Sequence, residues 1–148
     1  NSGDFSNSRI AHLTFNRAGG NRMTAYNWET NASNAGSDYF NQNDNYLSNS
    51  NVPGAAFTGQ IQTTLAAGGN YVMTVPMAGY VSADKNGDGD VNKTADFIHV
   101  RFNESKPRKG AAFTTSPDLT DKTVYQDEFV NFIKTQFRHD GAHQLYAG

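Results

Sequence analysis

The sequence contains no cysteine, which excludes a disulfide scaffold and a metal site built on thiolates. It has no run of about 18 apolar residues, the length that a membrane-spanning helix requires. The net charge of −2 provides no basic face for phosphate groups. The one basic cluster, at 106–109, is short, contains a proline and precedes a glycine, which is typical of a solvated loop. We therefore expect neither a membrane nor a nucleic acid as a partner.

Several catalytic signatures are also missing. The chain has no Gly-rich phosphate loop, no dinucleotide-binding fingerprint and no Gly-x-Ser-x-Gly motif, so nucleotide chemistry and nucleophilic serine catalysis have no support. With 36% hydrophobic and 12% aromatic residues, the chain can bury a core, so we expect a globular fold.

Asparagine is abundant instead, and 12 of the 17 asparagines lie within residues 1–51. Asparagine at this density favours turns and local bonds between side chains and backbone. We therefore interpret residues 29–54 as one long loop. Because loops beyond about 12–15 residues in compact domains are usually binding loops or disordered segments, this loop is a candidate for function.

Two segments have the periodicity of amphipathic helices. Apolar residues recur at i, i+4 and i+8 between 57 and 65, and Gly68 follows as a helix end. A second apolar stripe runs over 125–137, and Thr123 with Gln126 forms a capping-box pattern before it. Both segments are predicted to be helices.

Apolar runs between and after these helices predict strands. Residues 71–81 form a nearly continuous run, typical of a strand buried on both faces, with an irregularity expected at Pro76. A short strand is predicted at 97–102, and another begins at 144–147. The alternation of strands and helices is the order of parallel α/β units, so the predicted fold class is α/β.

The only tryptophan, Trp28, lies between Asn27 and Glu29 in a polar context. An indole face can stack on a pyranose ring, while amide and carboxylate groups can pair with vicinal hydroxyls. This pattern indicates a sugar site. The alternative is that Trp28 fills the core and the asparagine-rich segment is a solvated loop.

The segment from Gly19 to Tyr39, GGNRMTAYNWETNASNAGSDY, together with QNDNYL at 42–47, resembles the opening of glycoside hydrolase family 44. That family comprises secreted endo-β-1,4-glucanases and xyloglucanases built on a (β/α)8 barrel with an added β-domain. The resemblance implies parallel strands joined by long polar loops. Because such a barrel needs roughly 250 residues, we expect residues 1–148 to be its N-terminal segment, with the remaining barrel and the β-domain elsewhere in the polypeptide.

The resemblance also implies a retaining mechanism, which needs two carboxyl groups about 5–5.5 Å apart. The chain has three glutamates, at 29, 104 and 128, and their sequence contexts suggest no catalytic pair. In the family the acid/base glutamate lies in a Leu-Asp-Asn-Glu-Pro-like motif after a strand, and residues 144–148 match the approach to it. We therefore expect no catalytic residue within this chain.

What the resemblance leaves for this segment is part of the substrate-binding wall. Barrel sites gather at the C-terminal ends of strands. We predict Asn27, Trp28 and Glu29 at the end of the first strand and Tyr80 at the end of the second as substrate-binding residues. A core position is an open alternative for Tyr80.

A second feature is the loop 84–92, which places oxygen side chains at alternate positions and glycine at the sixth. This spacing resembles a calcium loop and predicts Asp84, Asn86, Asp88 and Asp90 as ligands of a structural Ca²⁺. The closing bidentate acid is displaced, with Ala95 at the twelfth position. A polar turn without metal is the alternative, and no organic cofactor is expected.

The sequence hypothesis is thus an endo-β-1,4-glucanase acting on cellulose derivatives, xyloglucan or xylan. Its partners are the β-glucan substrate and the rest of its own polypeptide. We expect it to be secreted, with no signal peptide preceding Asn1 in this sequence. Two alternatives stay open: a non-catalytic carbohydrate-binding module with a calcium-stabilised loop, which would be dominated by antiparallel strands, and an extracellular adhesion domain.

Overall fold

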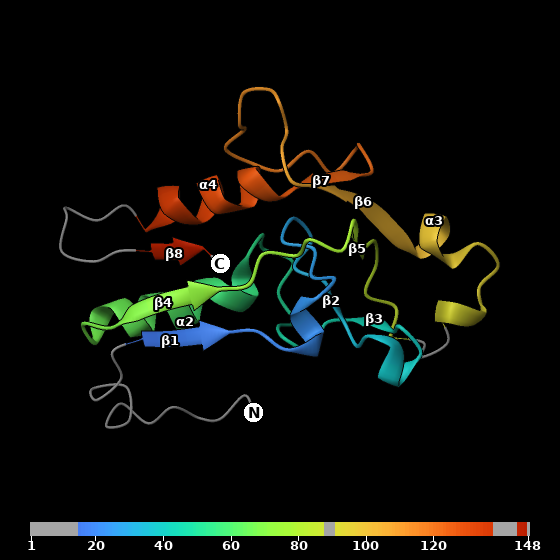
Figure 1. Ribbon diagram of the computed structural model, residues 1–148, viewed down its shortest axis with the longest axis horizontal. Helices are drawn as coiled ribbons and strands as arrows, with labels where there is room; N and C mark the ends of the chain where they lie inside the picture. Colours follow the sequence, from blue (N-terminus) through green and yellow to red (C-terminus); the bar gives the residue numbers. More distant parts are fainter. Residues whose placement is uncertain (1–14, 88–90, 138–144, 148) are drawn as a thin grey trace.

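The computed structural model describes residues 15–87, 91–137 and 145–147, and its elements lie along an elongated molecule (Figure 1). The strands are β1 (Phe15–Ala18), β2 (Ser33–Asn34), β3 (Asn43–Asp44), β4 (Asn70–Met73), β5 (Tyr80–Ser82), β6 (Phe102–Lys106), β7 (Thr123–Tyr125) and β8 (Leu145–Ala147). The helices are α2 (Ala55–Ala66), α3 (Phe97–Arg101) and α4 (Gln126–Gln136), with short 3-10 turns η1 (Asn21–Met23), η2 (Ser37–Tyr39) and η3 (Val91–Lys93).

A parallel sheet of three strands, in the order β1-β4-β8, forms one end of the molecule (Figure 1). Helix α2 connects β1 to β4, and α4 precedes β8, so the sheet consists of strand–helix–strand units. Ala18 pairs with Met73 and Met73 with Ala147, which aligns the C-terminal ends of all three strands in one row. The predicted α/β class and the strand at 144–147 are confirmed.

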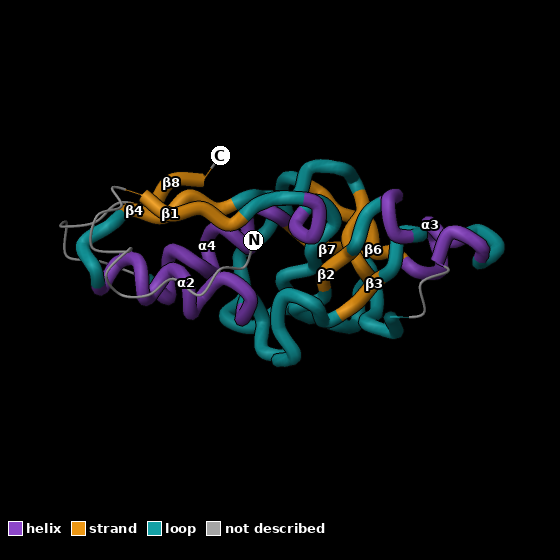
Figure 2. Tube along the Cα trace, turned by 90° about the horizontal axis from the view of Figure 1, so that it is seen from below, coloured by secondary structure: helices purple, strands orange, loops and turns teal. Residues whose placement is uncertain are grey.

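The two faces of this sheet differ. Helices α2 and α4 cover one face, while no described element covers the other (Figure 2). The covered face forms the main core, because alternate residues of β4 and the apolar stripes of both helices pack there. The stripe residues Phe57, Ile61, Phe129 and Ile133 are all at most 1% exposed. On the uncovered face Phe15 is 58% exposed.

Strand β5 belongs to a second sheet, of order β5-β6-β7, in which β5 runs antiparallel and β7 parallel to β6. The prediction of a single strand over 71–81 is therefore wrong. Its two ends form β4 and β5, and residues 74–79 between them leave the parallel sheet. Pro76 has no N–H for a strand ladder, which explains why the apolar run does not continue as one strand.

The asparagine-rich segment is folded rather than an open loop. Strands β2 and β3 form an antiparallel ladder, and Asn31, Asn34 and Asn43 are each at most 3% exposed. The Asn31 side-chain oxygen accepts hydrogen bonds from the Tyr26 hydroxyl and from the Ala56 N–H in the first turn of α2. The side chains of these asparagines supply hydrogen-bond partners inside the fold, so the high asparagine content of this segment serves the structure.

Two local predictions differ from the structure. Helix α4 begins after Tyr125 and has no side-chain cap, because Thr123 lies in β7. Residues 97–101 are a short helix rather than a strand, entered through the left-handed backbone of Asp96. Among the described helices, none has the length and apolar character needed to cross a bilayer.

Candidate functional site

The C-terminal edge of the parallel sheet carries a group of polar residues. Directly after β1, Gly19 and Gly20 turn the chain away from the sheet, and Gly20 has a φ of 98° that favours glycine. A Cβ on Gly19 would lie 3.1 Å from the Thr74 hydroxyl, which follows β4. Thr74 donates a 2.9 Å hydrogen bond to the Ala18 carbonyl. The two strand ends are therefore held in close contact.

Arg17 supplies a positive charge at this edge. It lies on β1 beside Val72 in the register, and its guanidinium lies near the position that a Gly19 side chain would occupy. Arg17 is exposed and forms no ion pair with any described residue. It is therefore free to donate hydrogen bonds to a ligand.

Asn21 and Arg22 fix the loop that follows. The Asn21 amide donates to the Ala35 carbonyl and to Asp38, which joins the strand end to the asparagine-rich segment. Arg22 forms an ion pair with Asp44 and lies 4.2 Å from the centre of the Tyr46 ring. The cation under the ring orients Tyr46, which is 65% exposed.

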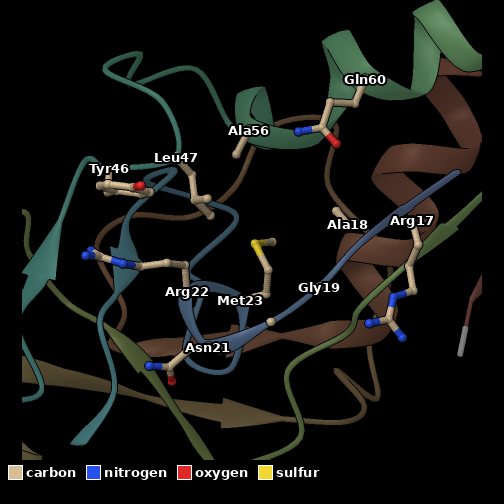
Figure 3. Close-up of a pocket in the computed structure, with 11 residues that line it drawn as sticks. Arg17, Ala18, Gly19, Asn21, Arg22, Met23, Tyr46, Leu47, Ala56 and Gln60 are labelled. Carbon is tan, nitrogen blue, oxygen red and sulfur yellow. The ribbon is translucent and has the colours of Figure 1, made fainter. Parts of the chain in front are cut away.

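These residues line a cavity of about 400 Å³, which we call the strand-end pocket (Figure 3). Its polar groups are guanidinium, amide and phenol groups without a carboxylate, and its apolar part includes Met23 and Leu47. An exposed aromatic ring beside hydrogen-bond donors is suited to a neutral hydroxylated ligand such as a sugar. The lining residues are Arg17, Ala18, Gly19, Gly20, Asn21, Arg22, Met23, Tyr46, Leu47, Ala56 and Gln60.

The structure places Asn27 and Trp28 inside the protein instead of at a strand end. The first strand ends at Ala18, eight or more residues earlier than the predicted end. Trp28 is 1% exposed, stacks on Phe129 of α4 and contacts Phe132 of the same helix at a tilted angle. Asn27 is fully buried and donates to the Ser82 carbonyl. Neither side chain presents a surface to a ligand.

Glu29 and Tyr80 lie apart from the strand-end pocket. Glu29 is 4% exposed and lines a different cavity. Burial raises the pKa of Glu29 to about 8, and the negative charges of Asp121 and Glu128 add to that effect. Tyr80 is 37% exposed on β5, opposite Glu104 in the second sheet. The structure does not bring the four predicted residues together.

The described glutamates offer no acid pair at the strand ends. Glu104 is exposed on β6 and pairs with Lys106 at 3.1 Å. Glu128 is buried, and its carboxylate accepts hydrogen bonds from Lys109 and Thr114. None of the three glutamates lines the strand-end pocket, so this cavity can bind a ligand but supplies no carboxylate for glycoside chemistry.

The structure describes part of the predicted calcium loop, residues 84–87 and 91–92. Asp84 accepts hydrogen bonds from the Arg101 guanidinium at 2.7 and 3.0 Å, and its Oδ1 also accepts the Asn86 N–H. Burial alone would raise the pKa of Asp84, but its bonds to Arg101 and Asn86 outweigh burial and lower it. Asp88 and Asp90 lie outside the described residues. Because both Asp84 oxygens already have partners, Asp84 fits a calcium ligand poorly, and Ca²⁺ in this loop stays a prediction.

Parallel strand–helix–strand units with polar groups at the strand ends define an α/β protein, a class in which ligands commonly bind at the carboxyl edge of the sheet. The chain belongs to glycoside hydrolase family 44, whose sequence model matches residues 32–147. This confirms the resemblance inferred from the sequence.

Individual relatives agree with this assignment. The chain is 40% identical over 129 residues to endoglucanase A of Paenibacillus lautus, covering 82% of this chain and 18% of that protein. A Paenibacillus polymyxa xyloglucanase of family 44, solved with xyloglucan, superposes with a TM-score of 0.76 at 40% identity, covering 92% of this chain and 27% of that chain. The endoglucanase Cel44A of Clostridium thermocellum gives a TM-score of 0.75 at 39% identity, over 85% of this chain and 26% of that one. The chain thus spans about a fifth to a quarter of the length of these relatives.

The residues predicted from the sequence and the strand-end pocket lie in the same segment of the chain, but Asn27, Trp28 and Glu29 do not line the pocket. The signal for the strand end was present in the Gly19-Gly20 pair, since consecutive glycines after a strand indicate a sharp turn. The position of the Tyr46 ring in the pocket had no such signal, because the ring packs on Arg22, which is 24 positions away in the sequence.

Proposed function

We propose that the polypeptide containing this chain hydrolyses internal β-1,4-glycosidic bonds in glucans, such as cellulose derivatives, xyloglucan and xylan. In this proposal residues 1–148 are the N-terminal segment of a (β/α)8 barrel and supply part of the substrate-binding wall. The catalytic glutamates lie elsewhere in the polypeptide. The protein is secreted, and its partners are the glucan and the rest of its own chain.

The observation that carries the proposal is the parallel sheet with aligned strand ends and one uncovered face. In a barrel, helices cover the outside of the sheet and side chains fill the inside. Here α2 and α4 cover one face. Asn16 of β1 bonds to Thr64 of α2, so by alternation the exposed Phe15 lies on the other face, around which further strands would close the barrel. Both β1 and β8 are edges of the described sheet and are available for pairing.

The strand-end pocket supports a wall for sugar binding. Active sites of barrels lie at the C-terminal ends of the strands, where Arg17 and the loop leading to Tyr46 are found. Tyr46 offers an exposed ring for stacking, and Arg17 offers donors that have no protein partner among the described residues. The relatives are an endoglucanase and a xyloglucanase, which favours a β-1,4-glucan as the substrate.

The two other hypotheses fit the structure less well. A carbohydrate-binding module dominated by antiparallel strands would not need the parallel sheet or its amphipathic helices. An adhesion domain would not need a polar pocket at the strand ends. Retention of configuration is proposed on the family resemblance alone.

The test uses the intact polypeptide and two arginine variants. Arg17→Ala should lower kcat/KM on xyloglucan and carboxymethylcellulose about tenfold, which corresponds to one lost charge-assisted contact of roughly 1.4 kcal/mol. Arg108→Ala removes an exposed arginine that does not line the pocket and should leave kcat/KM on both substrates unchanged. If Arg17→Ala and Arg108→Ala are equally active, Arg17 does not belong to the substrate-binding wall. An intact protein that cleaves no β-glucan would overturn the proposed function.

A further inference from the structure

A second cavity, of about 270 Å³, lies beside the sheet β5-β6-β7. We call it the Glu29 cavity, and it shares no lining residue with the strand-end pocket. Four parts of the chain meet there: the turn after Trp28, Ala83 directly after β5, the region of α3 and β6, and the segment before β7. The lining residues are Glu29, Thr30, Ala83, His99, Val100, Phe102, Asn103, Leu119, Thr120, Asp121 and Lys122.

Glu29 is a buried carboxylate without a protein partner. It is 4% exposed, and its carboxylate makes no hydrogen bond or ion pair with any described residue. Glu128 shows the contrast, since it is equally buried but accepts bonds from Lys109 and Thr114. A buried carboxylate in the folded state is expected to be paired, to coordinate a metal or to hold a proton.

Thr30, the next residue, also has a side-chain oxygen without a partner. The hydroxyl oxygen of Thr30 is buried and has no hydrogen-bond partner among the described residues. Buried polar atoms are almost always satisfied, so such an atom indicates an absent water molecule or ion. The Glu29 carboxylate and the Thr30 hydroxyl both line one cavity and both lack a partner. They point to a common ligand that oxygen atoms can coordinate.

The charges around the cavity specify a cation. Asp121 lines it from the opposite segment, is exposed, and accepts a hydrogen bond from the Thr123 N–H with one oxygen. Asp121 and Glu128 both raise the pKa of Glu29, and Lys109 is the one group that lowers it. Of the basic side chains in the lining, His99 is bonded to Asp96, and Lys122 is exposed to solvent. Negative charge at this place is thus only partly compensated.

We propose that the Glu29 cavity binds one Ca²⁺ ion through the carboxylates of Glu29 and Asp121 and the hydroxyl of Thr30. Backbone carbonyls and water complete its coordination. The set consists of hard oxygen atoms, which suits Ca²⁺ with its six to eight oxygen ligands. The cavity lining contains no cysteine, and its histidine, His99, is bonded to Asp96, so the available ligands differ from those of a zinc site. The ion would join the turn after Trp28 to the segment before β7.

Titration calorimetry with CaCl2 on the intact, chelator-treated polypeptide tests the proposal, together with the melting temperature. Ca²⁺ at about a hundredfold above its Kd should raise the melting temperature by roughly 5 °C, because it binds the native state. Glu29→Gln should abolish one binding site and that rise. Glu104→Gln, which changes an exposed glutamate outside the cavity, should leave both intact.

Two further variants keep the result interpretable. Asp121→Asn changes an exposed residue and should weaken calcium binding at least tenfold even if Glu29→Gln fails to fold. Asp84→Asn addresses the loop at 84–92 and should leave the site in the Glu29 cavity unchanged. Calcium binding that is lost in Asp84→Asn but retained in Asp121→Asn and Glu29→Gln would overturn the proposal. So would the absence of any calcium binding or calcium-dependent melting in the unmodified protein.

Discussion

The indole of Trp28 stacks on the ring of Phe129, with ring centres 5.6 Å apart and planes inclined by 12°. Phe132 packs against the same indole at 5.1 Å, so Trp28 joins the turn after η1 to α4. The backbone carbonyl of Trp28 also accepts a hydrogen bond from the Gly54 N–H at the start of α2. Trp28 therefore connects the two helices that cover the parallel sheet.

This position predicts a loss of stability when Trp28 is truncated. Trp28→Ala in the intact polypeptide should lower the free energy of unfolding by about 3–5 kcal/mol, since it removes a fully buried aromatic side chain. Denaturant unfolding measures the effect. Tyr39→Ala, at a residue that is 52% exposed, should change it by less than about 0.5 kcal/mol. A raised KM for glucan with unchanged stability would instead favour the sugar-stacking role predicted from the sequence.

Tyr46 is the aromatic residue that we expect to contact substrate. Tyr46→Ala should raise KM on xyloglucan about fivefold, equivalent to a stacking loss of about 1 kcal/mol, with little change in melting temperature because the ring is 65% exposed. Phe113→Ala removes another exposed ring, 44% exposed and outside the strand-end pocket, and serves as the matched control. If both variants bind substrate like the unmodified protein, Tyr46 has no part in the wall.

The sequence predicted both long helices, because apolar residues recur at helical spacing in each of them. Phe57 and Ile61 on one helix, and Phe129 and Ile133 on the other, occupy the core as their spacing indicates. Element type follows from such local patterns, and β8 was recognisable for the same reason. The strand predicted at 71–81 failed because an apolar run does not reveal which of two sheets each half joins.

The candidate site was harder to predict than the fold. A tryptophan among polar residues fits a sugar site and a core position equally well. Trp28 lies in the core because it packs against α4, which begins 98 positions later in the sequence. The calcium loop shows a related difficulty, because Asp84 is paired with Arg101, which no spacing rule indicates. Both outcomes depend on contacts between distant segments.

Glu29 should make stability depend on pH when no cation is bound. Its pKa is about 8 in the folded protein, above the usual value near 4.5, because burial disfavours the charged form. The folded state therefore holds a proton that the unfolded state releases, and stability should fall as the pH rises from about 4.5 to 8. The slope approaches 1.4 kcal/mol per pH unit within that window. Calcium-free unfolding curves at several pH values should show this slope, and Glu29→Gln should reduce it. An unchanged slope in that variant would assign the dependence to another group.

Glu128 should behave in the opposite way. Burial alone would raise its pKa, but hydrogen bonds from Lys109 and Thr114 lower it below the usual value. Its contribution is therefore present above the unfolded-state pKa, near 4.5, and is lost as the pH falls through the lower folded-state value. Glu128→Gln should lower the free energy of unfolding by about 2–3 kcal/mol at neutral pH, since it replaces the buried carboxylate that accepts these bonds by a neutral amide. Adding Lys109→Met should recover part of this loss in a double-mutant cycle, and strict additivity of the two changes would contradict a coupled pair.

The last prediction concerns residues 1–148 expressed alone. The described parallel sheet has two open edges, at β1 and β8, and one face without a covering layer, where Phe15 is 58% exposed. Open edges and an uncovered apolar face promote aggregation, so the segment should aggregate or remain without a cooperative melt. It should also release no reducing sugar from β-glucan at any pH, because none of its three glutamates lies in the strand-end pocket. Co-refolding with the remaining polypeptide should restore activity, whereas co-refolding with an unrelated barrel fragment should not. A soluble segment that melts cooperatively and cleaves glucan by itself would contradict both the barrel-segment proposal and the location of the catalytic glutamates, and Glu29 would then be the first carboxylate to substitute.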